Sequence, residues 1–302
     1  MSFVSLWENK SHKDTKNLCD TPSFSGHRPS VIGHRFPDNG QRTPNNFLRP
    51  SVIGHRPSFS PDNDQRTPNN LFEHRTTTNK HQTPMRILIL GATGRTGRHL
   101  LAQALERGYQ VQVLVRDRHK IRITHPELQV MQGHPADRAC LGKAIQGCEA
   151  VLSALNISRY NDFPWAALRT PHNFLSDVMA GIIALADSYA IRRVIFTSAW
   201  GVGDTEADIP GWLRWLVKKS NLRYPYQDLY RTEELLKKTQ LDWTAVRPAV
   251  LTNFKRRASC RVSLDNTPKP GLFISRATVA SFMLDALEKE LYVKQAPVIS
   301  AG

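Results

Sequence analysis

Three regularly spaced glycines stand where the chain could hold a phosphate. Gly91, Gly94 and Gly97 follow an apolar run at 86–90 and precede a helical pattern at 95–107. Glycine permits a tight turn at the first position, close approach of a diphosphate at the second, and close helix packing at the third. A helix N-terminus adds free N–H groups and partial positive charge. The spacing predicts a dinucleotide turn made of Gly91, Thr93, Gly94, Arg95, Thr96 and Gly97. The alternative is a glycine-rich turn with no ligand.

A cation follows the next apolar run. Arg116 comes directly after 110–115 and 19 residues after Gly97 (116 − 97). An acidic residue at this distance would bind the free ribose of NAD, whereas a guanidinium suits the 2′-phosphate of NADP. We therefore favour NADP(H) over NAD(H). Asp117 is the counter-evidence, and an Arg116 that is merely solvated at a strand end is the alternative.

The elements that must position these residues alternate from Met85 onward. Apolar runs rich in β-branched residues predict strands at 86–90, 110–115, 128–131, 150–155, 193–197 and 243–246. Helical patterns lie between them at 95–107, 137–146, 172–189 and 227–239. Such alternation predicts an α/β fold, a Rossmann-type doubly wound parallel sheet, over residues 85–302.

Residues 1–84 differ from the rest of the chain. RPSVIGHR occurs twice, and PDNGQRTPNN returns as PDNDQRTPNN. The segment holds too few apolar residues to offset its ordering entropy, so we expect a low-complexity, disordered N-terminal extension. Two other interpretations stay open: a basic arm that touches nucleic acid, and a translated upstream repeat with the true start at Met85. A peptide upstream of Met85 in the natural protein would contradict the second.

Five stretches together resemble a known group of enzymes. GATGRTG, VLVRD, VIFTSA, LDWTAVRP and GLFISRATVASFMLDAL are similar to the atypical short-chain dehydrogenase/reductases that bind NAD(P)H, of the flavin reductase/biliverdin-IXβ reductase type, and to their NmrA-like relatives. The resemblance runs from Met85 to the C-terminus. It implies that Arg116 holds the 2′-phosphate and that Ser198 lies near the nicotinamide. It also implies further cofactor contacts at Ser153, Ala154, Leu155, Arg247 and Pro248.

The proton donor expected for carbonyl reduction is missing. The Tyr-x-x-x-Lys pair of typical short-chain dehydrogenases is absent, since Leu229 occupies the lysine position. Tyr226 and Tyr230 are the candidate donors, provided that cations such as Arg223 or Arg231 lower their pKa. Both also suit plain packing. A flavin, quinone or tetrapyrrole-like acceptor relaxes the requirement, because its proton can come from solvent.

The stretch IPGWLRWLVKK at 209–219 predicts a short helix after the fifth strand. Its position predicts a substrate cap around 200–226, above the strand ends where ligands of this fold bind. A packing helix and a membrane-surface helix are the alternatives.

Bulk properties limit the partners. The net charge is +15 and the pI about 10.0, which permits polyanion binding. No apolar run is long enough for a membrane helix, and no signal peptide is visible, so we expect a cytoplasmic protein without membrane contact. Cys140 and Cys148 form no CxxC pair, so we expect no metal. We expect a small-molecule substrate, no nucleic acid apart from the basic-tail alternative, and a monomer or weak oligomer.

The leading hypothesis is an NADPH-dependent oxidoreductase that transfers a hydride to a small planar acceptor. The rival is a non-catalytic NADP(H)-binding redox sensor of the NmrA-like kind. A nucleotide-sugar epimerase shares the glycine turn but normally needs the Tyr-Lys pair, and nucleic-acid binding depends on charge alone.

Overall fold

The computed structural model describes residues 84–254 and 259–302. Nearly all of the extension expected to be disordered, 1–83, therefore lies outside the described residues.

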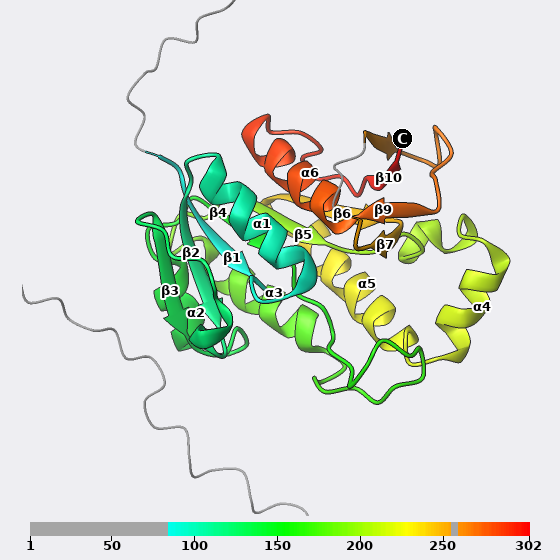
Figure 1. Cartoon of the computed structure of the whole chain (residues 1–302), viewed down its shortest axis with the longest axis horizontal. Coiled ribbons are helices and arrows are strands. Elements are labelled where there is room, and N and C mark those ends of the chain that lie inside the picture. Colours follow the sequence, from blue (N-terminus) through cyan, green and yellow to red (C-terminus); the bar gives the residue numbers. More distant parts are fainter. Residues whose placement is uncertain (1–83, 255–258) are drawn as a thin grey trace, which may run out of the picture. The chain divides into compact units, whose positions relative to one another are not determined.

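A mostly parallel sheet of eight strands forms the centre of this part of the chain (Figure 1). The strand order is β3-β2-β1-β4-β5-β6-β10-β8. The strands are β1 Arg86–Leu90, β2 Gln110–Val115, β3 Leu128–Gln132, β4 Ala150–Ser153, β5 Arg193–Thr197, β6 Asp242–Pro248, β8 Cys260–Ser263 and β10 Val298–Ala301. All neighbours pair in parallel except β8, which is antiparallel to β10. The Rossmann-type fold is thus confirmed, with one antiparallel strand at the edge.

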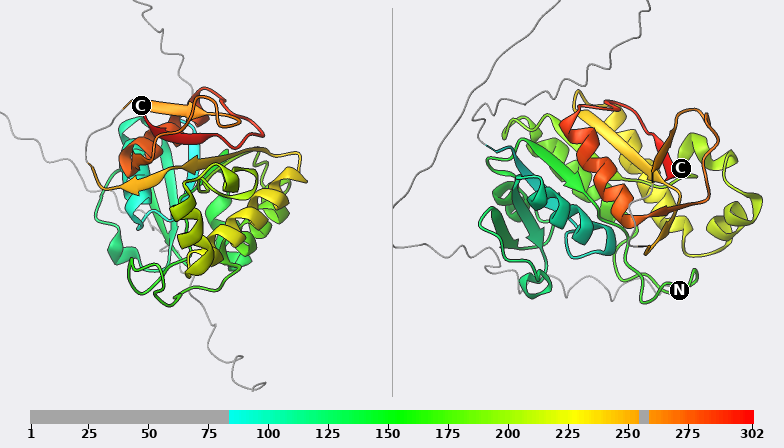
Figure 2. Two further views of the ribbon diagram at one scale, coloured as in Figure 1. Left: turned by 90° about the vertical axis from the view of Figure 1, so that its right-hand side faces the viewer. Right: turned by 45° about the horizontal axis from the view of Figure 1, so that its top comes forward.

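Helices cover both faces of this sheet. They are α1 Arg95–Glu106, α2 Arg138–Ile145, α3 Phe174–Ala186, α4 Gly211–Lys219, α5 Arg223–Lys237 and α6 Arg276–Glu288. Side chains of α1 and α6 belong to one hydrophobic core, and those of α2, α3 and α5 to the other. The left-hand view of Figure 2 shows α6 and α5 on opposite sides of the sheet.

The two cores follow from the alternation of side chains along β1. Ile87 and Ile89 enter the core with α1 and α6, while Leu88 and Leu90 enter the core with α2, α3 and α5. All four side chains are fully buried. A strand covered on both faces needs apolar residues at every position, which is why β1 reads as an unbroken apolar run.

The connections after β4 and β5 lie at the strand ends where ligands of this fold bind. Residues 154–173 link β4 to α3 and hold one isolated bridge, between Arg159 and Leu168. We call this connection the β4–α3 loop. After β5 come the short 3₁₀ helix η2, Gly203–Ala207, and then α4. The predicted short helix at 209–219 is present as α4. A second, two-stranded sheet pairs β7, Val250–Thr252, with β9, Phe273–Ser275.

Candidate functional site

The turn between β1 and α1 tolerates only glycine at two positions. Gly91 has a φ of +80°, and a Cβ there would lie 2.7 Å from the Ala154 carbonyl oxygen. A Cβ on Gly97 would lie 2.0 Å from the Gly91 oxygen. The Gly94 N–H closes the turn by donating to the same Gly91 oxygen at 2.9 Å. The chain therefore packs the start of α1 directly against the end of β1.

The outer side of this turn is open to a ligand. Gly94 is the N-cap of α1, is exposed, and caps the helix with no side chain. The first turn of α1 carries no acidic residue. A Cβ on Gly94 would meet only the Gly91 oxygen, at 3.1 Å. Uncapped N–H groups, a partial positive charge and a bare backbone are what a diphosphate requires, so these residues fit NAD(P)(H).

Arg95, the first residue of α1, is held by the β4–α3 loop. Its two terminal nitrogens donate to the carboxylate of Asp162 at 2.9 and 2.7 Å. The hydrogen bond and the charge of Arg95 lower the pKa of Asp162. Farther along, Trp165 Nε1 donates to the Lys219 carbonyl at 2.9 Å, and Asn221 donates back to the Trp165 carbonyl at 2.8 Å. The loop thus spans from the glycine turn to the C-terminal end of α4.

The end of β2 leaves one arginine uncommitted. Arg116 is exposed and makes no ion pair with a carboxylate in the described part of the chain. Asp117 accepts from the His119 N–H at 3.0 Å and lies 3.7 Å from Lys120 Nζ, so its carboxylate is already in use. Burial and the positive charge of Arg116 lower the pKa of His134, which stands at the end of β3. Arg116 is therefore free to bind a phosphate.

The end of β4 borders the glycine turn. The Ala154 N–H donates to the Leu90 carbonyl at 2.9 Å, and the Ala154 oxygen faces Gly91. Ser153 is buried, and its carbonyl accepts from Thr197 Oγ1 at 3.4 Å. Ser153, Ala154 and Leu155 are thus brought together with the dinucleotide turn.

Ser198 and Arg247 take part in a buried ionic network. Ser198 Oγ donates to Glu233 Oε1 at 2.6 Å. Arg247 donates to both oxygens of Glu233, at 3.1 and 2.6 Å, and to Asp204 Oδ1 at 2.6 Å. Burial opposes the charge of Arg247, but its hydrogen bonds with Glu233 and Asp204 outweigh this, so its pKa is raised. Pro248, the last residue of β6, accepts from the Trp200 N–H at 3.1 Å.

Sequence reasoning missed Glu233. It lies 35 residues from Ser198, and no local pattern links the two. A buried acid in the middle of a helix was the available signal, because such a charge requires a partner.

The two candidate tyrosines lie on one side of α5. Tyr226 Oη donates to the Trp200 carbonyl at 3.3 Å. Burial raises the pKa of Tyr226 to about 12. This is opposite to the lowering expected from nearby cations, and Arg223 donates instead to Tyr224 Oη at 2.8 Å. The Tyr230 side chain is 47% exposed.

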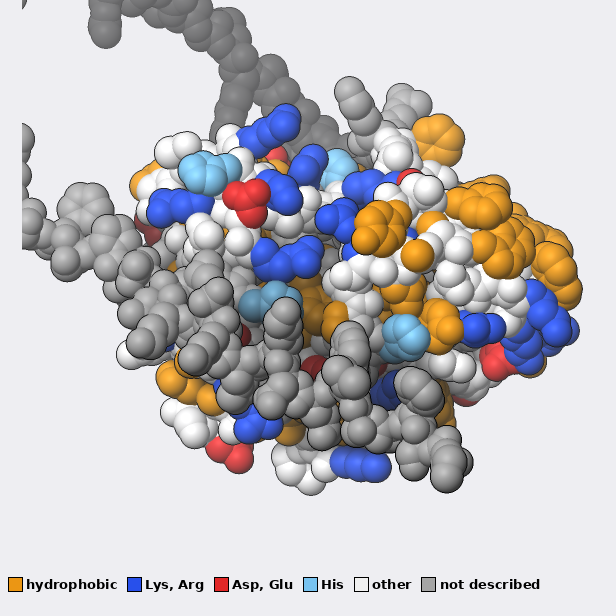
Figure 3. All heavy atoms as spheres, turned by 90° about the horizontal axis from the view of Figure 1, so that it is seen from below, with side chains coloured by type: hydrophobic (Ala, Val, Ile, Leu, Met, Phe, Trp, Pro, Cys, Tyr) orange, Lys and Arg blue, Asp and Glu red, His pale blue; other side chains and the backbone are white. Residues whose placement is uncertain are grey.

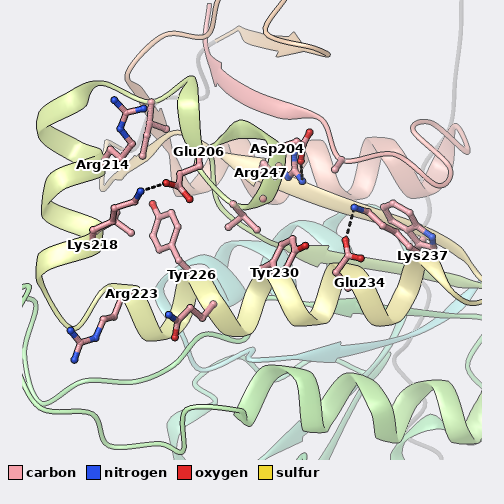
Figure 4. Close-up of a pocket in the computed structure, with 18 of the residues that line it drawn as sticks. Asp204, Glu206, Arg214, Lys218, Arg223, Tyr226, Tyr230, Glu234, Lys237 and Arg247 are labelled. Carbon is pink, nitrogen blue, oxygen red and sulfur yellow. Dashed lines mark hydrogen bonds and ion pairs between the residues drawn. The ribbon is translucent and has the colours of Figure 1, made fainter.

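Both tyrosines line a cavity of about 750 Å³, which we call the α5 cavity. Figure 4 shows them projecting from α5 toward η2. The glycine turn, Arg116 and residues 153–155 contribute no side chain to its lining. The structure therefore does not join Tyr226 and Tyr230 to the dinucleotide turn.

Helix α4 packs through one face only. Leu213 and Val217 are buried in the core, whereas Trp212 and Trp215 are each 57% exposed. Figure 3 shows hydrophobic side chains gathered at the end of the molecule where α4 lies in Figure 1. The two tryptophans of α4 thus face away from the core.

Searches for other kinds of site gave two further findings. Within 84–254 and 259–302, no group of three or more His, Cys, Asp or Glu residues is placed to hold a metal ion. Over the same residues no helix is both long and apolar enough to cross a membrane.

Comparisons with known proteins agree with the geometry of the turn. Residues 91–290 match the model of the NAD(P)H-binding family. The oxidoreductase stcQ of Emericella nidulans is 24% identical over 229 residues, covering 71% of this chain and 82% of that protein.

Two solved structures share the fold. The wide-type short-chain dehydrogenase/reductase of Veillonella parvula, in complex with NADP, aligns with a TM-score of 0.59 and 19% identity over 72% of this chain and 94% of that one. ChuY, an anaerobillin reductase from Escherichia coli O157:H7, aligns with a TM-score of 0.58 and 18% identity over 72% and 97%. With the uncapped glycine turn at its cofactor end, this chain belongs to the NAD(P)H-binding family.

Proposed function

We propose that the protein is an NADPH-dependent oxidoreductase that transfers a hydride to a small planar acceptor of the flavin, quinone or tetrapyrrole class. The observation that carries this proposal is the uncapped N-terminus of α1 behind Gly94, with an uncommitted arginine at the end of β2. The first feature suits a diphosphate, and the second suits one more phosphate at the adenosine end.

The preference for NADPH depends on the different contacts of Arg116 and Asp117, which are neighbours in the chain. Asp117 would have to accept hydrogen bonds from a ribose to favour NAD, but its carboxylate caps the 3₁₀ helix η1, Arg118–Lys120. Arg116 has no carboxylate partner within the described residues, and burial together with the charge of Arg116 lowers the pKa of the neighbouring His134. A 2′-phosphate at this place gains charge-assisted hydrogen bonds that a free ribose cannot make.

When bound, NADPH supplies the hydride, and the chain binds and orients the two reactants. The backbone at Gly91, Gly94 and Gly97 would hold the diphosphate, and the end of β4, which borders this turn, would hold the adjoining part of the coenzyme. The loop that holds Arg95 through Asp162 lies next to the glycine turn. Such positioning is the main protein contribution when the coenzyme carries the reactive bond.

The acceptor class follows from the side chains that could donate a proton to the reduced acceptor. Leu229 is buried where typical relatives carry a lysine, and the Tyr226 hydroxyl is bonded to a main-chain carbonyl with its pKa raised to about 12. Neither group lends a proton readily to an alkoxide. An acceptor that takes its proton from solvent is therefore favoured over a simple ketone. The anaerobillin reductase among the structural neighbours supports including tetrapyrroles among the acceptors tested.

A non-catalytic NADP(H) sensor is the second candidate, and one observation favours it. The Ser198 hydroxyl, which the resemblance sets near the nicotinamide, is committed to Glu233 at 2.6 Å. A sensor needs the coenzyme contacts but no group directed at an acceptor.

The test combines a coenzyme comparison with an acceptor panel. NADH and NADPH oxidation is followed by absorbance with flavins, quinones and linear tetrapyrroles, on wild type, Arg116→Ala and Arg192→Ala. Arg192 is an exposed arginine at the opposite end of the sheet, before β5, so its loss controls for charge. We expect turnover with at least one acceptor, and a loss of about tenfold or more in NADPH affinity for Arg116→Ala alone. Tight NADPH binding without turnover on any acceptor would support the sensor instead.

A further inference from the structure

Helix α5 packs against α3 on one side and borders the α5 cavity on the other. Asp228 faces α3, where its carboxylate accepts from the Leu175 N–H at 2.6 Å. Tyr226, Tyr230 and Lys237 project from the other side and line the α5 cavity (Figure 4). Residues of the glycine turn and of the β4 end do not line this cavity.

The floor of the α5 cavity is apolar and partly aromatic. Ile209, Val217, Tyr226, Trp243 and Ala296 contribute to it. A volume of about 750 Å³ lies within the range that holds a drug-sized organic molecule. Aromatic side chains at such a floor favour a flat ring system, which can stack on them.

The charges around the α5 cavity do not cancel. Three cations are paired: Lys218 with Glu206, Lys237 with Glu234, and Arg247 with Asp204.

Three more lining cations have no carboxylate partner in the part of the chain that the structure describes. They are Arg214, Arg223 and Lys294, of which Arg223 meets Tyr224 and Lys294 meets a glutamine oxygen. A concave site with surplus positive charge and an apolar floor favours an anion with an apolar body.

Arg247 offers a buried anchor that one ligand group can reach by replacing a single side chain. Arg247 is 2% exposed and is held on its inner side by Glu233, which is 1% exposed. Its outer partner, Asp204, is 70% exposed and accepts one hydrogen bond at 2.6 Å. A ligand carboxylate can take the place of Asp204 without leaving Arg247 unpaired.

We propose that the α5 cavity is a second ligand site, distinct from the coenzyme site, for an aromatic molecule that carries an acidic group. The ring lies against Tyr226 and Trp243, and the acid replaces Asp204 on Arg247 within reach of the surplus cations. The proposal goes beyond the hydride transfer inferred above and does not depend on it.

The test uses anilinonaphthalene sulfonate, a fluorescent aromatic anion of the proposed class, titrated into the full chain in the presence of saturating NADP⁺. We expect one saturable site. Arg214→Gln combined with Lys294→Gln should weaken it about tenfold through loss of charge-assisted contacts. Asp204→Asn should bind the probe about threefold more tightly or better, because the competing carboxylate is gone. Arg138→Gln, at an exposed arginine that starts α2, is the matched control and should change nothing.

A further variant tests the space itself. Val217→Trp fills the floor without changing charge and should abolish probe binding, while urea unfolding and NADPH affinity check that each variant is folded. Probe binding that appears only when NADP⁺ is left out would place the probe in the coenzyme site and overturn the proposal. So would an Asp204→Asn variant that binds no better than wild type, absence of binding to wild type, or loss of binding only on Trp215→Ala, which would put the probe on exposed α4.

Discussion

A single carboxylate at the N-cap of α1 should separate folding from coenzyme binding. Gly94 has φ −75° and ψ 169°, an extended conformation that any L-residue adopts, and no side chain caps the helix. Gly94→Asp therefore supplies a favoured N-cap residue. We expect stability to rise by a few tenths of a kcal/mol from the cap and by up to about 1 kcal/mol from the helix dipole. The close contact of a new Cβ with the Gly91 oxygen, at 3.1 Å, reduces this gain.

The same substitution should nearly abolish coenzyme binding. The aspartate would occupy N–H groups that a diphosphate needs, and it would add a negative charge beside it. Two unit charges about 4 Å apart repel by about 4 kcal/mol at an effective dielectric constant near 20. Allowing for salt screening, we expect NADPH affinity to fall by at least about a hundredfold, or about 2.7 kcal/mol.

The assay pairs isothermal titration calorimetry of NADPH with urea unfolding of the same sample. Gly94→Ala is the control, since it adds the Cβ without the charge, and we expect it to lose less than about tenfold in affinity. If folded Gly94→Asp bound NADPH within threefold of wild type, the diphosphate would not lie at this helix end, and the site described here would be wrong.

The remaining predictions concern packing and the loop. Gly97→Ala should destabilise the protein by about 2–4 kcal/mol, because its Cβ would lie 2.0 Å from a carbonyl oxygen. Gly211→Ala should stabilise it by up to about 1 kcal/mol, because there is open space around the new Cβ. Urea unfolding midpoints measure both effects. Glu233→Ala should cost about 3–5 kcal/mol in the free energy of unfolding, since it strips a buried arginine of its inner partner, and a loss below about 1 kcal/mol would show that the network is dispensable. Asp162→Asn should free Arg95 and so raise the association rate of NADPH up to about fivefold in stopped-flow measurements. The effect is small because the Arg95–Asp162 ion pair is exposed. An unchanged rate would mean that this ion pair does not compete with the diphosphate.

Most strands of the sheet could be predicted from the sequence, because the central strands are unbroken apolar runs. β1, β2 and β5 were predicted with their observed bounds, since burial on both faces demands unbroken apolar runs. β8 and β10, four residues each, were not predicted. Their pairing depends on partners distant in the chain, which a local pattern does not encode.

The candidate site divides along the same line. The glycine turn is local, so three glycines and a helix start sufficed to find it, and the structure brings 153–155 beside it. The clamp on Arg95 comes from a residue 67 positions away, and the hydroxyl of Ser198 meets an acid 35 positions away. The condition that nearby cations lower the pKa of Tyr226 is not met, because burial raises this pKa. Contacts set by tertiary packing are invisible to spacing rules.

Helix α5 also bears on how such a protein can change over generations. Residues 228, 229, 232 and 236 hold one side of the helix against the core, while 226, 230, 234 and 237 line the α5 cavity. A mutation on the cavity side changes which ligands the α5 cavity binds. The residues that pack α5 against the core keep their contacts. New ligand specificities can therefore evolve on this side of α5 without loss of the fold.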